Sequence, residues 1–267
     1  MPSDFVGTTI KEDVHRALLE EAGVANLVAA DPTPIPAMGD RENYYADRHL
    51  EYWLSGLLDF RKVMATLPDL NRPARYLDIG GSTGRVVRHA FARPDLEVWV
   101  SDINVNWIDW IDKHFAFGVR AFQSRIHPHL PIEDGYFSLI SGFSVFTHMD
   151  TDEVAWLLEL RRVLAPGGVA YLTINDEGVW DLLSNENWAW LRGSMSRGNR
   201  DEEFRVLCSA PLAGERLVWA YSEAESYNIN TFLRRDYVVR KWSQFFEVLE
   251  VRPFYHGYQT VVMLRKP

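Results

Sequence analysis

A short apolar strand that ends in an acid and turns through glycines constrains this chain most. The segment runs YLDIGGSTGRVVRHAF from Tyr76 to Phe91. Gly80 and Gly84 lack a Cβ, so the chain can turn sharply there and a ligand can approach the backbone closely. Asp78, at the end of the strand, can accept hydrogen bonds from a ligand or orient the loop. This order predicts a strand, a loop and a helix that hold a nucleoside-bearing ligand.

Beyond residue 73, segments typical of strands alternate with segments typical of helices. Strands are expected at residues 75–79, 97–101, 119–122, 136–142 and 168–174. Helices between them fit residues 83–92, 106–114 and 151–164. Alternation at this interval implies right-handed crossovers and a mainly parallel sheet. Two β-rich runs, at 246–254 and 259–265, predict an antiparallel hairpin at the edge of the sheet.

The N-terminal part of the chain and the region after the fifth strand have different patterns. Residues 11–30 and 41–67 carry apolar side chains at helical spacing, and a proline-rich stretch separates them. We therefore expect an N-terminal helical cap over residues 1–72 and an α/β domain over residues 73–267. Residues 175–226 have no clean period, and we interpret them as an insertion over the open face of the sheet.

Composition excludes several classes of protein. The apolar fraction is 47% and the charged fraction 24%, which are ordinary values for a globular protein. A formal net charge of −9 argues against broad binding to the phosphate backbone of nucleic acids. Cys208 is the only cysteine, so there is no intrachain disulfide. We find no signal-peptide pattern and no apolar run long enough for a membrane span, so we expect a cytoplasmic protein with no membrane partner.

A longer ordered run points to one family. The loop Asp78-Ile-Gly-Gly-Ser-Thr-Gly84 has an acid-x-Gly-x-Gly-x-Gly pattern, with Ser82 in place of the middle glycine. It is followed by LPIEDGYFSLI at 130–140, SGFSVFTHM at 141–149 and LAPGG at 164–168. In this order the chain resembles the class I S-adenosylmethionine-dependent methyltransferases. The resemblance implies a three-layer α/β sandwich with a Rossmann-like, seven-stranded, mostly parallel sheet and an antiparallel last strand.

The resemblance also implies S-adenosyl-L-methionine as cofactor, with S-adenosyl-L-homocysteine as product. Asp102 would accept hydrogen bonds from both ribose hydroxyls, and the alternative is that it caps the next helix. Ile103 would pack on the adenine, and Gln123 or Ser124 would contact the edge of the adenine. The alternative, equally supported, is that Gln123 and Ser124 belong to an ordinary loop without a cofactor contact. The cofactor contacts implied in this way are Asp78, Gly80, Gly81, Ser82, Gly84, Asp102, Ile103, Gln123, Ser124 and Phe143.

Two histidines are candidates for a catalytic base. His148 follows the fourth strand, where the reactive methyl group would point in this family, and a neutral imidazole can take a proton from a substrate hydroxyl. The alternative is that His148 only packs and hydrogen-bonds at the start of a helix. His256, in the C-terminal hairpin, is the second candidate. His127 and His129 could join Asp150 or Asp152 around a divalent ion, but the spacing is no strong signature and we predict no required metal.

The expected reaction is methylation of a hydroxyl on a sugar or small metabolite, because the run resembles bacterial enzymes of glycan and secondary-metabolite biosynthesis. Methylation of nitrogen or carbon, and a nucleoside-binding protein without activity, stay open as alternatives. Trp180, Trp188 and Trp190 either stack on a flat substrate or fill the core. Arg48 either meets the cofactor carboxylate or packs within its helix. A homodimer is possible, and no nucleic acid is expected as partner.

Overall fold

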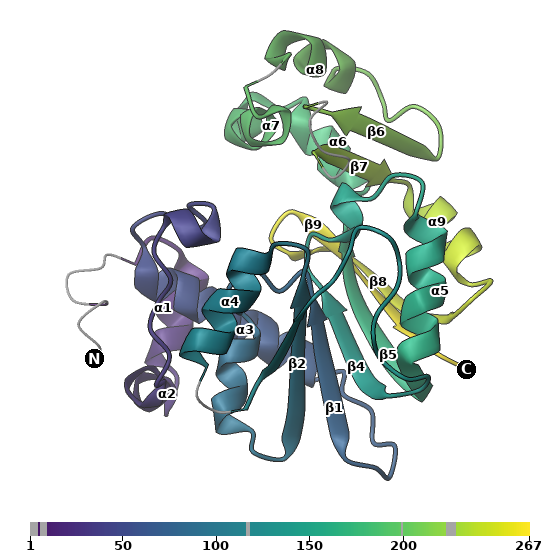
Figure 1. Cartoon of the computed structure of the whole chain (residues 1–267). Coiled ribbons are helices and arrows are strands. Elements are labelled where there is room, and N and C mark those ends of the chain that lie inside the picture. The colour runs from purple at the N-terminus through teal and green to yellow at the C-terminus, as the bar shows by residue number, and fades with distance from the viewer. Residues whose placement is uncertain (1–4, 6–9, 116–117, 199, 223–227) are drawn as a thin grey trace. The chain divides into compact units, whose positions relative to one another are not determined.

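The computed structural model describes residue 5 and residues 10–115, 118–198, 200–222 and 228–267 (Figure 1). The chain divides into two compact units. The first comprises residues 1–125 and 137–141, and the second comprises residues 126–136 and 142–267.

The main sheet has seven strands in the order β3-β2-β1-β4-β5-β9-β8. The strands are β1 (Ala74–Ile79), β2 (Leu96–Asp102), β3 (Arg120–Gln123), β4 (Phe137–Gly142), β5 (Leu164–Ile174), β8 (Glu247–His256) and β9 (Gln259–Arg265). β1 pairs with β2, and β2 with β3, in parallel, whereas β9 runs antiparallel to both β5 and β8. The mostly parallel sheet with an antiparallel last strand is confirmed.

Helices flank the strands within each unit. In the first unit, α4 (Val105–His114) contacts β2 and β3. In the second unit, α5 (Glu153–Val163) contacts β5, and α9 (Arg235–Trp242) contacts β8. α4 and α5 begin and end within a few residues of the sequence prediction, because their apolar positions repeat at helical spacing.

The N-terminal helices differ from the prediction. The single helix expected over 11–30 is two helices, α1 (Asp13–Glu20) and α2 (Val24–Ala30), because the chain turns at Gly23 with φ of 87°. The helix expected from residue 41 begins only at His49, as α3 (His49–Met64). Before it, a short 3-10 helix, η2 (Gly39–Arg41), leads into four residues with positive φ: Glu42, Asn43, Tyr45 and Ala46.

The helix expected over 83–92 is also wrong in type. The chain forms one turn, closed by the Arg88 N–H to the Gly84 carbonyl at 3.0 Å, and then the 3-10 helix η3 (Val87–Ala92). Helix α3 comes so near that a Cβ on Gly56 would stand 2.2 Å from the Arg85 carbonyl oxygen. This close backbone contact outweighs the local preference for a regular α-helix.

The region without a clear sequence period has a hydrophobic core of its own. It contains α6 (Glu177–Leu183), the 3-10 helix η5 (Glu186–Trp188), α7 (Ala189–Ser196), α8 (Asp201–Cys208) and a two-stranded antiparallel sheet of β6 (Arg216–Ala220) and β7 (Ile229–Leu233). Figure 1 shows these elements gathered in green. Trp180, Phe204 and Phe232 are at most 1% exposed and pack ring to ring at its centre. Trp180 is therefore a core residue.

None of the helices in the described part of the chain is both long and apolar enough to cross a membrane.

Candidate functional site

The loop after β1 is held in a conformation that favours glycine. Gly80, Ser82 and Gly84 have φ of 63°, 50° and 79°. A Cβ on Gly81 would stand 2.4 Å from Val100 Cγ2, and one on Gly84 would stand 2.5 Å from the Phe115 ring. Gly81 is therefore needed for close packing against Val100, and Gly84 both for close packing against Phe115 and for the turn. Ser82 stands where the family pattern has a glycine, and its backbone adopts the left-handed region. This conformation is strained for a residue that has a Cβ.

Asp78 is buried at the end of β1 and is the end of a hydrogen-bond chain. The Ser141 hydroxyl donates to its Oδ1, and the Tyr76 hydroxyl and the Ser141 hydroxyl lie 2.7 Å apart. Burial raises the pKa of Asp78 to about 7, although the Ser141 hydrogen bond and the charge of Arg85 act against that rise. The carboxyl group is thus poised to change its charge near neutral pH.

An ion pair lies directly beyond the glycine loop. Arg85 Nη1 is 2.7 Å from Asp59 Oδ2 on α3, and both side chains are largely buried. Burial lowers the pKa of Arg85, but the Asp59 carboxylate more than offsets this and the net pKa lies above its ordinary value. The guanidinium also lies 5.4 Å from the centre of the Tyr44 ring. The pair ties α3 and the segment before it to the residues that follow the loop.

Asp102 ties the ends of β1 and β2 together. Its Oδ2 accepts the Ser82 N–H at 2.9 Å and its Oδ1 accepts the Asn104 N–H at 3.0 Å. Burial raises the pKa of Asp102, and these backbone donors oppose the rise. The cap of α4 is Asn104, whose side chain accepts the Asn106 N–H at 3.0 Å. Asp102 therefore orients the loop, and the reading of Asp102 as the helix cap is wrong.

The next predicted contacts gather at the same edge. The Gln123 side-chain amide donates to the Ile103 carbonyl at 3.0 Å, and the Ser124 N–H donates to the Asp102 carbonyl at 2.9 Å. Gln123 is exposed and Ser124 is buried. The structure thus places Asp102, Ile103, Gln123 and Ser124 together at the carboxyl ends of β2 and β3, which is the edge where open α/β sheets bind ligands.

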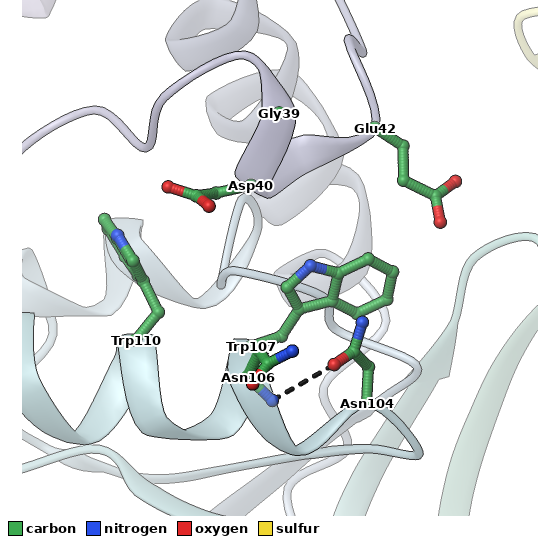
Figure 2. Close-up of a pocket in the computed structure, with 7 residues that line it drawn as sticks. All are labelled: Gly39, Asp40, Glu42, Asn104, Asn106, Trp107 and Trp110. Carbon is green, nitrogen blue, oxygen red and sulfur yellow. Dashed lines mark hydrogen bonds between the residues drawn. The ribbon is translucent and has the colours of Figure 1, made fainter.

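A cavity of about 270 Å³ lies beside this edge. Figure 2 shows Asn104, Asn106, Trp107 and Trp110 at α4, and Asp40 with Glu42 on the segment that faces them. The cavity combines indole rings with two carboxylates, which suits a flat ligand that carries positive charge. Sequence reasoning missed its N-terminal side, because residues 39–42 have no pattern of their own.

In the second unit, Phe143 and His256 lie together. Their ring centres are 4.8 Å apart, and Phe143 also lies 5.7 Å from the Tyr171 ring. Next to Phe143, the Ser144 N–H donates to Thr173 Oγ1 at 2.7 Å. Phe143 is half-buried, so it offers part of a ring face at the end of β4.

His148 belongs to a different group of contacts in this unit. It ends the 3-10 helix η4 (Phe146–His148), and its Nδ1 lies 2.6 Å from the Ile229 carbonyl. A carbonyl can only accept, so Nδ1 is the donor in this hydrogen bond, and in the neutral ring Nε2 is the basic nitrogen. The side chain is half-buried. This tautomer is the one a general base needs at Nε2.

The histidines considered for a metal site are not gathered around one. His127 Nδ1 lies 3.9 Å from Asp152 Oδ2, and the His127 side chain is 88% exposed. Within the described ranges, one group has ligand atoms close enough for an ion, namely Glu12, His15 and Glu51. Glu51 already accepts the N–H groups of Lys11 and Glu12 and pairs with a guanidinium, so its carboxylate is occupied by protein donors.

Comparison with known proteins bears on this geometry. Residues 77–168 match a family described as a methyltransferase domain. A malonyl-[acyl-carrier protein] O-methyltransferase of Geobacter sulfurreducens is 30% identical over 161 residues. That match covers 57% of this chain and 60% of the length of the relative.

Solved structures share the fold at low identity. A 1,6-didemethyltoxoflavin N1-methyltransferase of Burkholderia thailandensis is 12% identical, with a TM-score of 0.54 over 97% of this chain and 92% of that chain. A methyltransferase of Methanosarcina mazei is 17% identical, with a TM-score of 0.51 over 76% of this chain and 96% of that chain. A possible histamine N-methyltransferase of Thermotoga maritima is 16% identical, with a TM-score of 0.52 over 86% of this chain and 98% of that chain.

The family match begins within β1 at Leu77, covers the glycine loop and both acids, and ends within β5 at Gly168. Residues 77–168 are thus similar to a methyltransferase domain, in agreement with the resemblance to the class I S-adenosylmethionine-dependent methyltransferases. Around the glycine loop, the residues that sequence reasoning missed are Ser141, Asp59 and Arg85. They come from β4, from α3 and from the segment after the loop, so no local pattern connects them. A serine at the end of β4 or an aspartate within an amphipathic helix carries no signal until the fold brings it to the loop.

Proposed function

We propose that the protein is an S-adenosylmethionine-dependent methyltransferase and that the glycine loop and its two acids hold the cofactor. The observation that carries this proposal is the tie between Asp102 and the Ser82 N–H at 2.9 Å, which joins the loop to the end of β2. The loop is too close to Val100 and Phe115 for side chains at Gly81 and Gly84, so at these two positions the loop is bare backbone, which a ligand can approach closely. The residues present therefore fit an adenosyl ligand.

Each acid has a proposed part in holding the cofactor. Asp102 would accept the ribose hydroxyls, because a carboxylate can accept from two neighbouring donors at once. Asp78 would face the amino-acid end, where an ionised carboxylate suits an ammonium group. Ile103 and Phe143 would contribute apolar contacts, and Gln123 and Ser124 would contact the adenine edge. Gly80 and Gly84 would keep the backbone accessible.

The proposed chemistry depends mainly on placement. S-adenosylmethionine supplies an electrophilic methyl group on a positively charged sulfur. Holding the nucleophile in line with that group contributes roughly 7–11 kcal/mol in well-oriented systems. His148 would take the proton from the nucleophile at Nε2, since its Nδ1 proton is held by the Ile229 carbonyl. General-base catalysis of this kind contributes about 10²–10⁴-fold. His256 is the second candidate for this part.

We propose a hydroxyl on a sugar or small metabolite as acceptor. Trp190 is 61% exposed, and its ring centre lies 5.7 Å from that of Trp188 and 6.4 Å from that of Tyr258. An exposed aromatic group of this kind suits the apolar face of a sugar ring. The Geobacter sulfurreducens relative is named as an O-methyltransferase, which agrees with an oxygen acceptor. Two structural neighbours are named as an N1-methyltransferase and a possible N-methyltransferase, so nitrogen stays an alternative.

The same proposal includes two domains, a helical cap at 1–72 and a methyltransferase domain at 73–267. It also includes a cytoplasmic location and a homodimer.

The test has a binding part and a reaction part. Calorimetry would compare S-adenosylmethionine, S-adenosylhomocysteine and NAD. We expect the first two to bind, and we expect Asp102→Ala to weaken both at least about tenfold, as the loss of a charge-assisted hydrogen bond does. Binding of NAD alone would overturn the proposal.

Incubation of a metabolite pool with isotopically labelled S-adenosylmethionine, followed by mass spectrometry, would then find the acceptor. A labelled O-methyl product is expected. Cofactor binding without any labelled product from pools rich in sugars and small metabolites would favour a nucleoside-binding protein without activity.

A further inference from the structure

Strand β7 holds the end of η4 through two hydrogen bonds that lie close together. The Ile229 carbonyl accepts from His148 Nδ1 at 2.6 Å. Two residues further along the strand, the Thr231 hydroxyl donates to the Met149 carbonyl, also at 2.6 Å. The first bond orients the imidazole ring, and the second fixes the backbone of the residue that follows it. β7 therefore contacts both the ring of His148 and the backbone next to it.

Strand β7 is itself well anchored. All five of its residues are buried, and Thr231 is 1% exposed. One edge of β7 pairs with β6, and at its end the Leu233 N–H donates at 2.9 Å to the carbonyl of Asn175, directly after β5. Arg216, on β6, lies 2.7 Å from the carboxylate of Asp150, just beyond η4. The end of η4 is thus tied to both strands of a small sheet that is joined to the main one.

The same strand is bound to the helix that carries Trp190. Asn230 is 6% exposed, and its Nδ2 donates to the Met195 carbonyl on α7 at 2.7 Å. Successive side chains of a strand point to opposite faces, so Asn230 and Thr231 reach different partners. β7 therefore connects the proposed base, His148, with the helix of the aromatic group proposed to contact the acceptor.

We propose that Thr231 is a positioning residue for methyl transfer and that β7 sets the place of His148 relative to the acceptor. This inference rests on the proposed function, in which His148 takes the proton from the acceptor. A general base must lie within about 3 Å of the group whose proton it removes. A misplacement of about 1 Å can cost about a hundredfold in rate. One bond to the ring leaves the backbone of η4 free to shift, and the Thr231 bond prevents that shift.

The first measurement reads the state of the His148 ring without any substrate. Nuclear magnetic resonance of protein made with isotopically labelled histidine distinguishes a neutral ring protonated at Nδ1 from one protonated at Nε2, and His148→Gln identifies the signal. We expect the wild-type ring to be protonated at Nδ1. Thr231→Val keeps the shape of the side chain but removes its hydroxyl, so it should shift the ring towards the other tautomer. Thr231→Ser should restore the wild-type state.

The second measurement uses the acceptor found by mass spectrometry. Thr231→Val should lower kcat at least about tenfold and leave KM nearly unchanged, because a misplaced base slows only the chemical step. Thr231→Cys keeps a weaker donor and should give a smaller effect in the same direction, which also serves if Thr231→Val does not fold.

Thr66→Val is the matched control, because it removes a bond of the same kind, from Thr66 Oγ1 to the Val63 carbonyl at 2.7 Å. It should change neither the tautomer nor kcat. An unchanged tautomer in the Thr231 variants overturns the inference and leaves the proposed function intact. A changed tautomer with wild-type kcat also overturns it, and removes His148 as the base.

Discussion

Asp78 and Asp102 stand at neighbouring strand ends but accept different donors. Asp78 accepts a hydroxyl of Ser141, whereas Asp102 accepts two backbone N–H groups. Backbone donors are fixed by the fold, and they oppose the effect of burial on the Asp102 pKa. Asp78 has weaker support, and burial raises its pKa to about 7. Asp102 therefore holds the loop, whereas Asp78 is the acid whose charge changes near neutral pH.

The pKa of Asp78 predicts a pH-dependent stability. Its pKa is higher in the folded protein than the ordinary value of 3.8, so the folded state binds the proton more tightly than the unfolded state. This contribution is fully present below pH 4 and is lost as the pH rises through about 7. It amounts to roughly 4 kcal/mol, at 1.36 kcal/mol for each pKa unit. Asp78→Asn should remove it.

Urea unfolding at a series of pH values from 4 to 8 would measure this effect. The free energy of unfolding of the wild-type protein should fall more steeply with rising pH than that of Asp78→Asn. The exposed Asp112→Asn serves as control and should follow the wild-type curve. Parallel curves for wild type and Asp78→Asn would show that Asp78 does not titrate in this range.

His148 carries a prediction on turnover. His148→Ala should lower turnover at least about a hundredfold, because it removes the proposed general base. The affinity for S-adenosylhomocysteine should stay nearly unchanged. Steady-state rates with the acceptor found by mass spectrometry, together with calorimetry, would check both. His127→Ala, at a side chain that is 88% exposed, should leave both values unchanged. Wild-type turnover in His148→Ala would remove His148 as the base.

The glycine loop shows how an element combines backbone conformation with packing. Gly84 and Gly118 have nearly equal positive φ, 79° and 84°. A Cβ on Gly84 would meet the Phe115 ring at 2.5 Å, whereas a Cβ on Gly118 would meet nothing within 4 Å. The two positions therefore separate the cost of the left-handed backbone from the cost of overpacking.

Alanine at the two glycines should destabilise the protein unequally. Gly118→Ala should lower the free energy of unfolding by about 1–2 kcal/mol, the cost of a left-handed L-residue. Gly84→Ala should lower it by about 1–3 kcal/mol more, the usual cost of overpacking. Chemical denaturation of the two variants would measure the difference. Equal losses would mean that the Phe115 ring moves aside freely.

At the scale of the whole molecule, Asp31 joins the N-terminal helices to the α/β elements of the first unit. Its Oδ2 accepts Arg88 Nε at 2.8 Å and the Trp53 indole N–H at 2.7 Å, and its Oδ1 accepts the Thr33 N–H at 2.8 Å. The Asp31 and Arg88 side chains are 2% and 1% exposed. The connector after α2 is thus fixed by a buried ion pair.

Removal of this pair should be far more costly than removal of a surface pair. Asp31→Ala leaves the Arg88 charge buried without its acid, which costs about 3–5 kcal/mol. The exposed pair of Arg93 and Asp95, at 2.7 Å, is the matched control, and Asp95→Ala should cost at most about 1 kcal/mol. Thermal and urea unfolding would measure both. Similar losses for the two variants would contradict a structural part for Asp31.

Sequence by itself predicted the sheet and the resemblance to a methyltransferase family. The strands around the glycine loop and the hairpin at the C-terminus are encoded by local runs of apolar and β-branched residues, which fit a pleated, half-buried surface. β9 has the predicted bounds, Gln259–Arg265. The loop could be recognised from the sequence because a tight turn with positive φ favours glycine locally, whatever the rest of the chain does.

Only the tertiary structure decided the start of α3, the 3-10 form of η3 and the partners of the charged groups. Each depends on residues distant in the sequence: the Arg85 carbonyl against Gly56, Ser141 on Asp78, and Arg41 on the Tyr52 ring. A charged side chain looks alike in the sequence whether or not an acid reaches it. Its burial and its partners are properties of the folded chain, because they arise from contacts between elements and from the desolvation that those contacts impose.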